Sequence, residues 1–263
     1  MPPLKLLCLH GHTQSAATFA KRTRALAKKL KHIAELHFID APIELPSEAL
    51  EGEGTPSSEG AESAEAASQP GRTWWRLGSL EGEELERGFR DADSLPYIGL
   101  EEALSAVETT WNRAGDFDGI LSFSQGAALA SIVCYCSAGA APALSLRPPP
   151  RFAIIVSAFL HPRPASLPDY PAAVPLALPT LHVYGMADLF VAHERSAAVA
   201  ALFEDAELFV HEGGHYVPQQ KDQIPVFERF LTRFLRDDNA AGGPVPGRNG
   251  VAGAVETSGA AAR

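Results

Sequence analysis

The most informative stretch of the sequence is "GILSFSQGAAL", residues 119–129. A largely apolar run leads into a tight turn of small residues and then into an alanine-rich helical pattern, with Ser124 at the apex. This order is typical of the nucleophile elbow, whose full form is Gly-x-Ser-x-Gly. Here Ser122 stands in place of the first glycine. The pentapeptide alone therefore leaves two interpretations open, an activated serine or a serine that begins an ordinary helix.

Short β-type runs alternate with helical patterns along the rest of the chain. Near-continuous apolar strands separated by helices predict a mostly parallel sheet covered on both faces, and right-handed crossovers make such a sheet doubly wound. The expected fold class is α/β. The expected strands cover 4–10, 34–40, 117–123, 151–159, 178–185 and 206–212, and the expected helices cover 15–31, 98–115, 125–138, 191–203 and 221–237.

Two segments lie outside this alternation, and both are rich in Gly and Ala with almost no large apolar side chains. Such segments bury too little surface to offset the entropy lost on ordering. We therefore predict a single domain over 1–237, with 47–72 as a disordered acidic loop insertion. We predict a disordered C-terminal tail over 238–263.

Composition excludes several classes of protein. The formal net charge of −10 argues against a nucleic-acid or anionic-membrane partner, and the basic run at 21–31 fits a solvated helix face. Cys8, Cys134 and Cys136 lie in apolar stretches and are expected to be buried free thiols. The N-terminal apolar run is too short for a signal peptide, and no run is long enough to span a membrane. We expect a soluble, cytoplasmic protein.

Three reactive side chains each follow the end of a different expected strand: Ser124, Asp188 and His215. Ligands of such sheets bind beyond the carboxyl ends of the strands, which share one edge. Serine, then acid, then histidine is the chain order of the α/β-hydrolase fold. We therefore predict an α/β-hydrolase fold in which these three residues form a catalytic triad.

The chemistry explains the residue types. A serine hydroxyl is a weak nucleophile that needs a base within hydrogen-bonding distance, here His215, which Asp188 would orient. The tetrahedral oxyanion needs backbone donors aimed at it, each typically worth about 3 kcal/mol. We expect these donors to be the N–H groups of Gln125, at the start of the elbow helix, and of His12, after the first strand. No metal or organic cofactor is expected.

Other residues and other roles compete with these assignments. Asp188 could cap the next helix, Asp205 precedes a strand and so lies at the wrong edge, and His211 lies inside a strand. Trp74 and Trp75 are either core or pocket wall. Because adjacent side chains point in different directions, one of the two tryptophans is expected to line the substrate site.

His10 and His12 form an H-x-H pair that could suggest a metal site. No carboxylate or third histidine is near them in sequence, so a structural role beside a backbone oxyanion donor is favoured over metal binding.

Five stretches together resemble a known family in order and spacing: "LLCLHGHTQSAATF", "RTWWRL", "FDGILSFSQGAALAS", "VYGMAD" and "HEGGHYVP". They are similar to the FSH family of serine hydrolases, small α/β-hydrolases, over about residues 4–235. The resemblance implies Ser124 as nucleophile, Asp188 as acid and His215 as base. The chain departs from the family pattern at Ser122, at His12, where an apolar residue is common, and in the long insertion before Trp74.

The resemblance implies hydrolysis of carboxylic acyl or alkyl esters. Some fungal relatives are instead thioesterases that release polyketide chains from a carrier protein, so a thioesterase acting on carrier-bound or CoA-bound acyl groups is the alternative. Both reactions pass through the same acyl-enzyme, and the sequence does not separate them. A non-catalytic binding protein on the same fold is the second alternative, which the complete triad disfavours.

Overall fold

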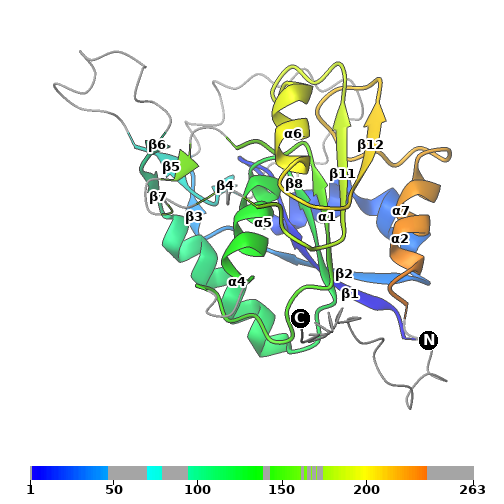
Figure 1. The fold of residues 1–263 in the computed structure, drawn as a ribbon, viewed down its shortest axis with the longest axis horizontal. Helices are drawn as coiled ribbons and strands as arrows, with labels where there is room; N and C mark the ends of the chain where they lie inside the picture. The colour runs from blue at the N-terminus through cyan, green and yellow to red at the C-terminus, as the bar shows by residue number, and fades with distance from the viewer. Residues whose placement is uncertain are drawn as a thin grey trace, which may run out of the picture.

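The computed structural model describes residues 2–46, 70–78, 94–138, 143–160, 163–164, 167, 170 and 174–235. Within these ranges, a six-stranded sheet runs in the order β12-β11-β9-β8-β1-β2, and all neighbouring strands are parallel (Figure 1). The strands are β1 (Leu4–Leu9), β2 (Ala34–Ile39), β8 (Gly119–Phe123), β9 (Phe152–Val156), β11 (Thr180–Gly185) and β12 (Ala206–His211). The predicted α/β class with a parallel sheet is confirmed.

The strand order places a topological switch in the middle of the sheet. The chain goes from β1 outward to β2, and then returns to add β8 on the other side of β1. Crossovers that leave in opposite directions open a crevice beyond the carboxyl ends of the two strands at the switch, here β1 and β8. Ser124 directly follows β8 and His12 lies in the loop after β1, so both are at this crevice.

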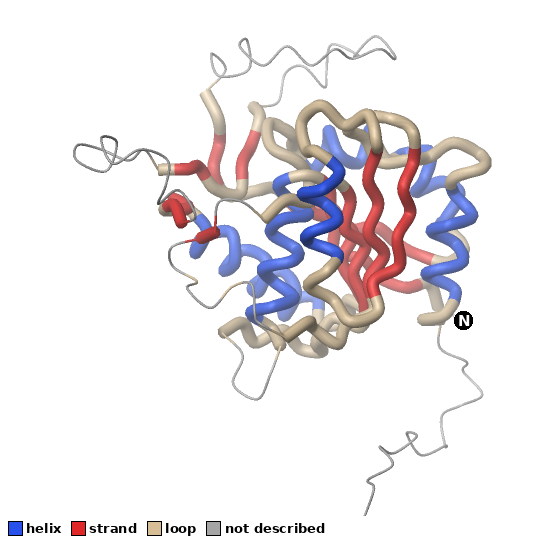
Figure 2. The backbone as a smooth tube through the Cα atoms, turned by 45° about the horizontal axis from the view of Figure 1, so that its top comes forward, coloured by secondary structure: helices blue, strands red, loops and turns tan. Residues whose placement is uncertain are grey.

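Helices cover both faces of the sheet (Figure 2). Alternate residues of each strand point to opposite faces of the sheet, so each face has its own hydrophobic cluster. Each cluster packs one set of helices against the sheet. Leu7 and Leu9 belong to the first cluster, whereas Leu6 and Cys8 belong to the second. The first set is α4 (Leu100–Ala114), α5 (Gln125–Cys136) and α6 (His193–Ala200), and the second is α1 (Ala16–Arg22), α2 (Arg24–Leu30) and α7 (Ile224–Thr232).

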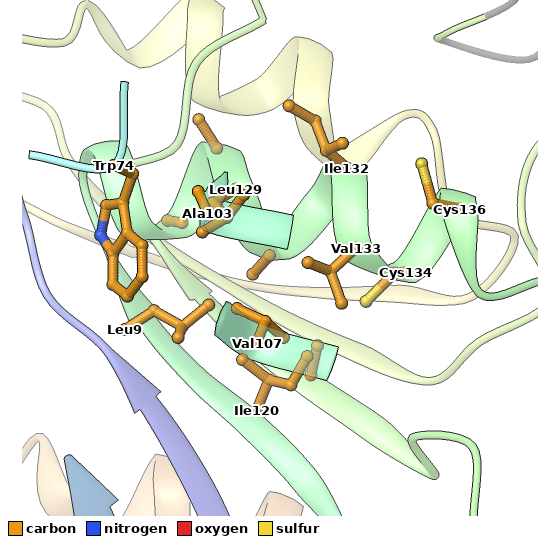
Figure 3. Close-up of a cluster of buried hydrophobic side chains, with 14 of the residues drawn as sticks. Leu9, Trp74, Ala103, Val107, Ile120, Leu129, Ile132, Val133, Cys134 and Cys136 are labelled. Carbon is orange, nitrogen blue, oxygen red and sulfur yellow. The ribbon is translucent and has the colours of Figure 1, made fainter. Parts of the chain in front are cut away.

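The first cluster extends to the segment that carries the tryptophans. Figure 3 shows Trp74 beside Leu9 of β1, with Ala103 and Val107 of α4 and Ile120 of β8 nearby. Trp74 is fully buried. The hydrophobic core on this face of the sheet therefore extends to the carboxyl ends of β1 and β8.

The single helix expected over 15–31 is two helices, α1 and α2, that meet at Thr23. The buried Thr23 hydroxyl donates to the Phe19 carbonyl at 2.7 Å, the type of side-chain bond that bends helices. Ser15 caps α1 by accepting from the Thr18 N–H at 3.2 Å. The lysines and arginines of 21–31 are exposed, as predicted.

Three two-residue ladders were not predicted, because so short a strand carries no readable alternation. They pair β3 (Ile43–Glu44) with β4 (Arg72–Thr73), β5 (Arg76–Leu77) with β7 (Tyr97–Ile98), and β6 (Ser94–Leu95) with β10 (Arg163–Pro164). Residues 47–69 of the predicted acidic insertion and the whole predicted tail, 238–263, lie outside the described residues. At the end of the range 47–72, Arg72 lies in β4 and donates to the Ala41 carbonyl at 2.9 Å.

All three cysteines are buried and free, as predicted. Burial raises the pKa of Cys134 to about 12 and that of Cys136 to about 11, and it also raises the pKa of Cys8. These thiols therefore stay protonated at neutral pH and are poor nucleophiles. Among the described residues, no helix is both long and apolar enough to cross a bilayer.

His182, in the middle of β11, is 1% exposed and packs against Phe203 with ring centroids 5.2 Å apart. Burial lowers its pKa to about 3. The unfolded chain has a histidine pKa of about 6.5. Stability from this group is therefore fully present above pH 6.5 and is lost as the pH falls toward 3.

Replacing His182 with leucine should make stability less sensitive to acid. Below pH 6.5 the unfolded wild type takes up a proton that the folded state excludes, so its free energy of unfolding should fall by about 1.4 kcal/mol per pH unit more steeply than that of His182→Leu. Urea unfolding of both proteins at pH 7.5, 6.5, 5.5 and 4.5 would measure this difference. Parallel curves for the two proteins would contradict the assignment.

Candidate active site

Ser124 lies on a sharp reversal between β8 and α5. Its backbone has φ 54° and ψ −119°, on the side of conformational space that residues other than glycine rarely adopt. The Ser124 N–H donates to the Val156 carbonyl of β9 at 2.9 Å, and the Ser124 carbonyl accepts from Ala127 and Ala128. A strained backbone conformation persists only where surrounding contacts enforce it, and these hydrogen bonds do so here.

The small residues on either side of Ser124 have direct steric causes. A Cβ atom on Gly126 would lie 2.4 Å from the carbonyl oxygens of both Leu9 and His10, so the elbow helix touches the backbone after β1. Ser122 is fully buried, and its hydroxyl donates to the Ile154 carbonyl at 3.0 Å. Serine therefore fits in place of the first glycine of the elbow.

The structure brings the three predicted triad residues into one hydrogen-bonded series. The Ser124 Oγ lies 2.9 Å from His215 Nε2, and His215 Nδ1 lies 2.7 Å from Asp188 Oδ2. Because the carboxylate only accepts, Nδ1 carries the proton and Nε2 is left to accept from the serine hydroxyl. This is the arrangement that a general base needs before it activates a nucleophile.

Asp188 is buried, and its carboxylate is held by three groups. Its Oδ1 accepts from the N–H groups of Phe190 and Val191 at 2.9 and 2.8 Å, while its Oδ2 faces His215. Burial raises the pKa of Asp188, but the bonds from His215 and the two N–H groups outweigh burial, so the net pKa lies below its ordinary value. The carboxylate is therefore ionised at neutral pH. Ala192 is the N-cap of α6, so Asp188 does not cap that helix.

The loops that carry Asp188 and His215 are packed backbone to backbone. The Ala187 N–H donates to the Gly213 carbonyl at 3.0 Å, and a Cβ on Gly185 would lie 2.1 Å from that same oxygen. The rival base His211 ends β12 and supports this loop, since its Nδ1 accepts from the Gly213 N–H at 3.1 Å. Asp205 is exposed at the amino end of β12, away from His215.

Aromatic rings flank the His215 imidazole. The Phe123 ring centroid lies 4.7 Å from it, and the Phe190 ring centroid lies 5.4 Å from it. Sequence reasoning missed Phe190, although its place two residues after the acid was an available signal. The two rings pack against the imidazole and limit how far it can tilt.

The two predicted oxyanion donors lie in neighbouring segments: Gln125 begins α5, and His12 is in the loop after β1. Gln125 is the first residue of α5, where backbone N–H groups have no acceptor within the helix and the helix dipole is positive. A Cβ on Gly11 would lie 3.3 Å from the Ser124 Cβ, so the loop that contains His12 passes directly beside Ser124. Their backbone role stays a prediction.

His10 has both ring nitrogens occupied. Its Nε2 accepts from the Ala41 N–H at 3.0 Å, so its Nδ1 carries the proton and donates to the Gly11 carbonyl at 2.8 Å. Burial lowers the pKa of His10 to about 4 and keeps the ring neutral. These contacts support the structural role expected for this residue.

The two tryptophans are buried rather than exposed in the crevice. Trp74 donates from Nε1 to the His10 carbonyl at 2.8 Å, and the Trp75 ring stacks on Tyr97 with centroids 4.8 Å apart. The expected contact of one tryptophan with substrate stays a prediction. The Trp74 N–H also donates to the Gln125 side chain at 3.0 Å, a link across 51 residues of sequence that no local pattern could reveal.

Fold and site together define a class: an α/β-hydrolase with a serine, a histidine and an acid placed at the carboxyl edge of a parallel sheet. A family model described as "Serine hydrolase (FSH1)" matches residues 1–226. The chain belongs to this family, as its sequence predicted, and is thus a member of a family of hydrolytic enzymes.

Relatives and solved structures agree with this assignment. Human Esterase OVCA2 is 37% identical over 237 residues, covering 88% of this chain and 97% of that protein. Esterase CG5412 of Drosophila melanogaster is 32% identical, covering 89% of this chain and 75% of that protein. Among solved structures, Zea mays acyl-protein thioesterase 2 has a TM-score of 0.54 and 18% identity, covering 87% of this chain and 94% of that one. Bacillus cereus carboxylesterase has a TM-score of 0.54 and 13% identity, covering 89% of each chain. These two structures confirm the fold.

Adding a methyl group at Gly126 should separate the elbow from the loop after β1. The groups it would meet are backbone carbonyls, which cannot rotate away, so α5 must shift. We expect Gly126→Ala to lower kcat/KM on a short p-nitrophenyl ester by roughly 100-fold or more, the scale that follows from a displacement near 1 Å.

The matched control is Gly115→Ala, at the end of α4, where φ is 70° and the added Cβ would lie at an ordinary contact distance of 3.8 Å from the Asn112 carbonyl. It should lower the melting temperature through backbone strain and leave kcat/KM unchanged. Equal losses of activity in the two variants would show that the effect comes from general destabilisation instead.

Proposed function

We propose that this protein is a serine esterase that hydrolyses carboxylic acyl esters through an acyl-enzyme intermediate on Ser124. The observation that carries the proposal is the continuous series from Ser124 Oγ to His215 to the buried Asp188 carboxylate. Membership in a serine hydrolase family and the names of the esterase relatives support it.

Each step follows from the position of a side chain. As Ser124 Oγ attacks the ester carbonyl carbon, its proton passes to His215 Nε2, and Asp188 stabilises the imidazolium. The negative charge on the former carbonyl oxygen accepts hydrogen bonds from the backbone N–H groups of Gln125 and His12. Collapse of this intermediate expels the alcohol, which takes the proton from His215. Water, deprotonated by His215, then attacks the acyl-enzyme and releases the carboxylic acid and Ser124.

The surface around the triad favours an apolar acyl or alkyl group. Four of the nine large apolar side chains exposed among the described residues lie in the two loops that carry the acid and the base: Met186, Leu189, Phe190 and Tyr216. Leu189 is 90% exposed, and it follows Asp188 directly. Clustered exposed apolar side chains next to a reactive group mark a surface that binds apolar ligand.

Replacing the nucleophile should remove turnover without affecting the fold. Ser124→Ala deletes the attacking hydroxyl without changing the packing around it. We therefore expect ester hydrolysis to fall by at least about 10,000-fold. The variant should also lose covalent labelling by a fluorophosphonate probe. Spectrophotometric ester assays would measure turnover, and intact-mass measurement would detect covalent labelling.

The control is Ser131→Ala, a buried serine of the same helix whose hydroxyl contacts Ala128 and Tyr170 instead. It should keep its activity and its labelling. Turnover retained by purified Ser124→Ala would refute the proposed function, and it would favour a different nucleophile.

Substrate preference should depend on the exposed apolar side chains beside the triad. We expect kcat/KM to rise from acetyl to octanoyl esters, and Leu189→Ser to lower the octanoyl value by roughly 5-fold while the acetyl value stays within 2-fold, as partial burial of one leucine predicts. Each acyl group would be offered as an oxygen ester and as the matching thioester.

Leu208→Ser, at an equally apolar position that is 56% exposed on β12, is the control and should change neither value. A chain-length profile that is flat in the wild type would contradict the apolar preference. A higher kcat/KM on thioesters at every chain length would assign the enzyme to thioester hydrolysis.

A further inference from the structure

We infer that Thr73 is a positioning residue for the proposed oxyanion side of the site. Its hydroxyl connects the loop after β1, which carries His12, to Gln125 at the start of α5. This inference rests on the proposed hydrolytic function, and it assigns a role to a side chain that does not touch the reacting atoms.

The geometry around Thr73 joins three separate segments. Its buried Oγ1 lies 2.9 Å from His12 Nδ1, 2.9 Å from Gln125 Oε1 and 2.7 Å from the Trp75 carbonyl. His12 and Gln125 are the two residues whose backbone N–H groups are the proposed oxyanion donors. A single side chain therefore contacts the side chains of both.

Counting protons fixes the direction of these bonds. The Trp75 carbonyl and Gln125 Oε1 only accept, so the one hydroxyl proton of Thr73 points between them. The Thr73 oxygen must then accept from His12, which places a proton on His12 Nδ1. His12 therefore donates a hydrogen bond to the buried Thr73 oxygen, whose own proton is shared between the Trp75 carbonyl and Gln125 Oε1.

The backbone between His12 and Gln14 is strained. Thr13 has φ 64°, and its neighbours on both sides are tied to β4: His12 to the Thr73 hydroxyl, and the Gln14 carbonyl to the Arg72 N–H at 2.9 Å. Such a conformation persists only when the surroundings enforce it. Because this loop passes beside Ser124, releasing one anchor would shift the His12 N–H relative to the nucleophile.

The Trp75 carbonyl and Gln125 Oε1 each accept a hydrogen bond from a second donor besides Thr73. Gln125 Nε2 donates to the Trp75 carbonyl at 2.9 Å, and the Trp74 N–H donates to Gln125 Oε1 at 3.0 Å. Replacing Thr73 with the isosteric valine therefore leaves both carbonyls bonded and removes the contact with His12. The substitution separates positioning from folding.

The experiment compares Thr73→Val with Thr73→Ser, which keeps the hydroxyl. Readouts are kcat and KM on a short p-nitrophenyl ester and the inhibition constant of an alkyl trifluoromethyl ketone, whose serine adduct carries an oxyanion. Thr73→Val should lower kcat about 10-fold with KM within 2-fold, and it should weaken the ketone about 10-fold, a fraction of the loss that follows from deleting a whole donor. Thr73→Ser should restore both values to within 3-fold of wild type.

Two further variants separate positioning from loss of stability. Thr23→Val removes an equally buried hydroxyl, bonded to the Phe19 carbonyl at the junction of α1 and α2, and should lower the melting temperature without changing kcat or inhibition. His12→Leu cuts the same bond from the other side and keeps the backbone N–H. If the bond acts as a unit, the double variant should lose no more kcat than either single variant.

Wild-type kcat and ketone inhibition in Thr73→Val would overturn the inference, as would an equal loss in Thr23→Val or additive losses in the double variant. Ser124→Ala is assayed in parallel. If Ser124→Ala is inactive while Thr73→Val matches wild type, only the positioning role fails. If Ser124→Ala retains turnover, the proposed function fails, and this inference fails with it.

Discussion

The parallel pairing of β1 with β8 is the constraint on which the site depends. Its register sets Leu9 opposite Ser122, so the loop after β1 and the elbow after β8 leave the sheet at the same height. The contact is tight enough that only glycine fits at position 126, against the Leu9 and His10 carbonyls. Strand order then places Asp188, after β11, and His215, after β12, along the same edge.

Burial acts in opposite directions on the two kinds of titratable group in and around the site. For His10, desolvation dominates, and its pKa falls until the ring is neutral and available to accept from Ala41. For Asp188, desolvation is outweighed by the bonds from His215 and two backbone N–H groups, so the carboxylate stays charged. The difference is that donors stabilise the charged form of Asp188, whereas too few acceptors or anions surround His10 to offset the burial of its cation. His10 therefore stays neutral, while the buried Asp188 carboxylate stays charged beside His215.

β4 shows how a two-residue strand can matter more than its length suggests. It follows 47–69 in the chain, yet its Arg72 and Thr73 contact the loop after β1, and Trp74 and Trp75 contact the Gln125 side chain. The segment thus joins the two loops at the central crevice of the sheet. The family motif that contains both tryptophans has a structural reason here, since Trp74 fills the core beneath His10.

Much of this protein could be read from local sequence. Apolar strands alternating with helical patterns predict a parallel α/β sheet, and the carboxyl ends of such strands necessarily share an edge, so Ser124, Asp188 and His215 could be grouped before any coordinates. The break at Thr23 could not, because it depends on one side-chain bond to Phe19 that competes with strong helical periodicity.

Tertiary structure alone decided the contacts between segments distant in the chain. His12 and Thr73 are 61 residues apart, and Thr73 and Gln125 are 52 apart, so no period or spacing relates them. Likewise, whether Trp74 and Trp75 face solvent or core depended on how β4 docks. Local patterns report which face of an element is apolar, whereas a hydrogen bond between loops depends on the position of both chains in space.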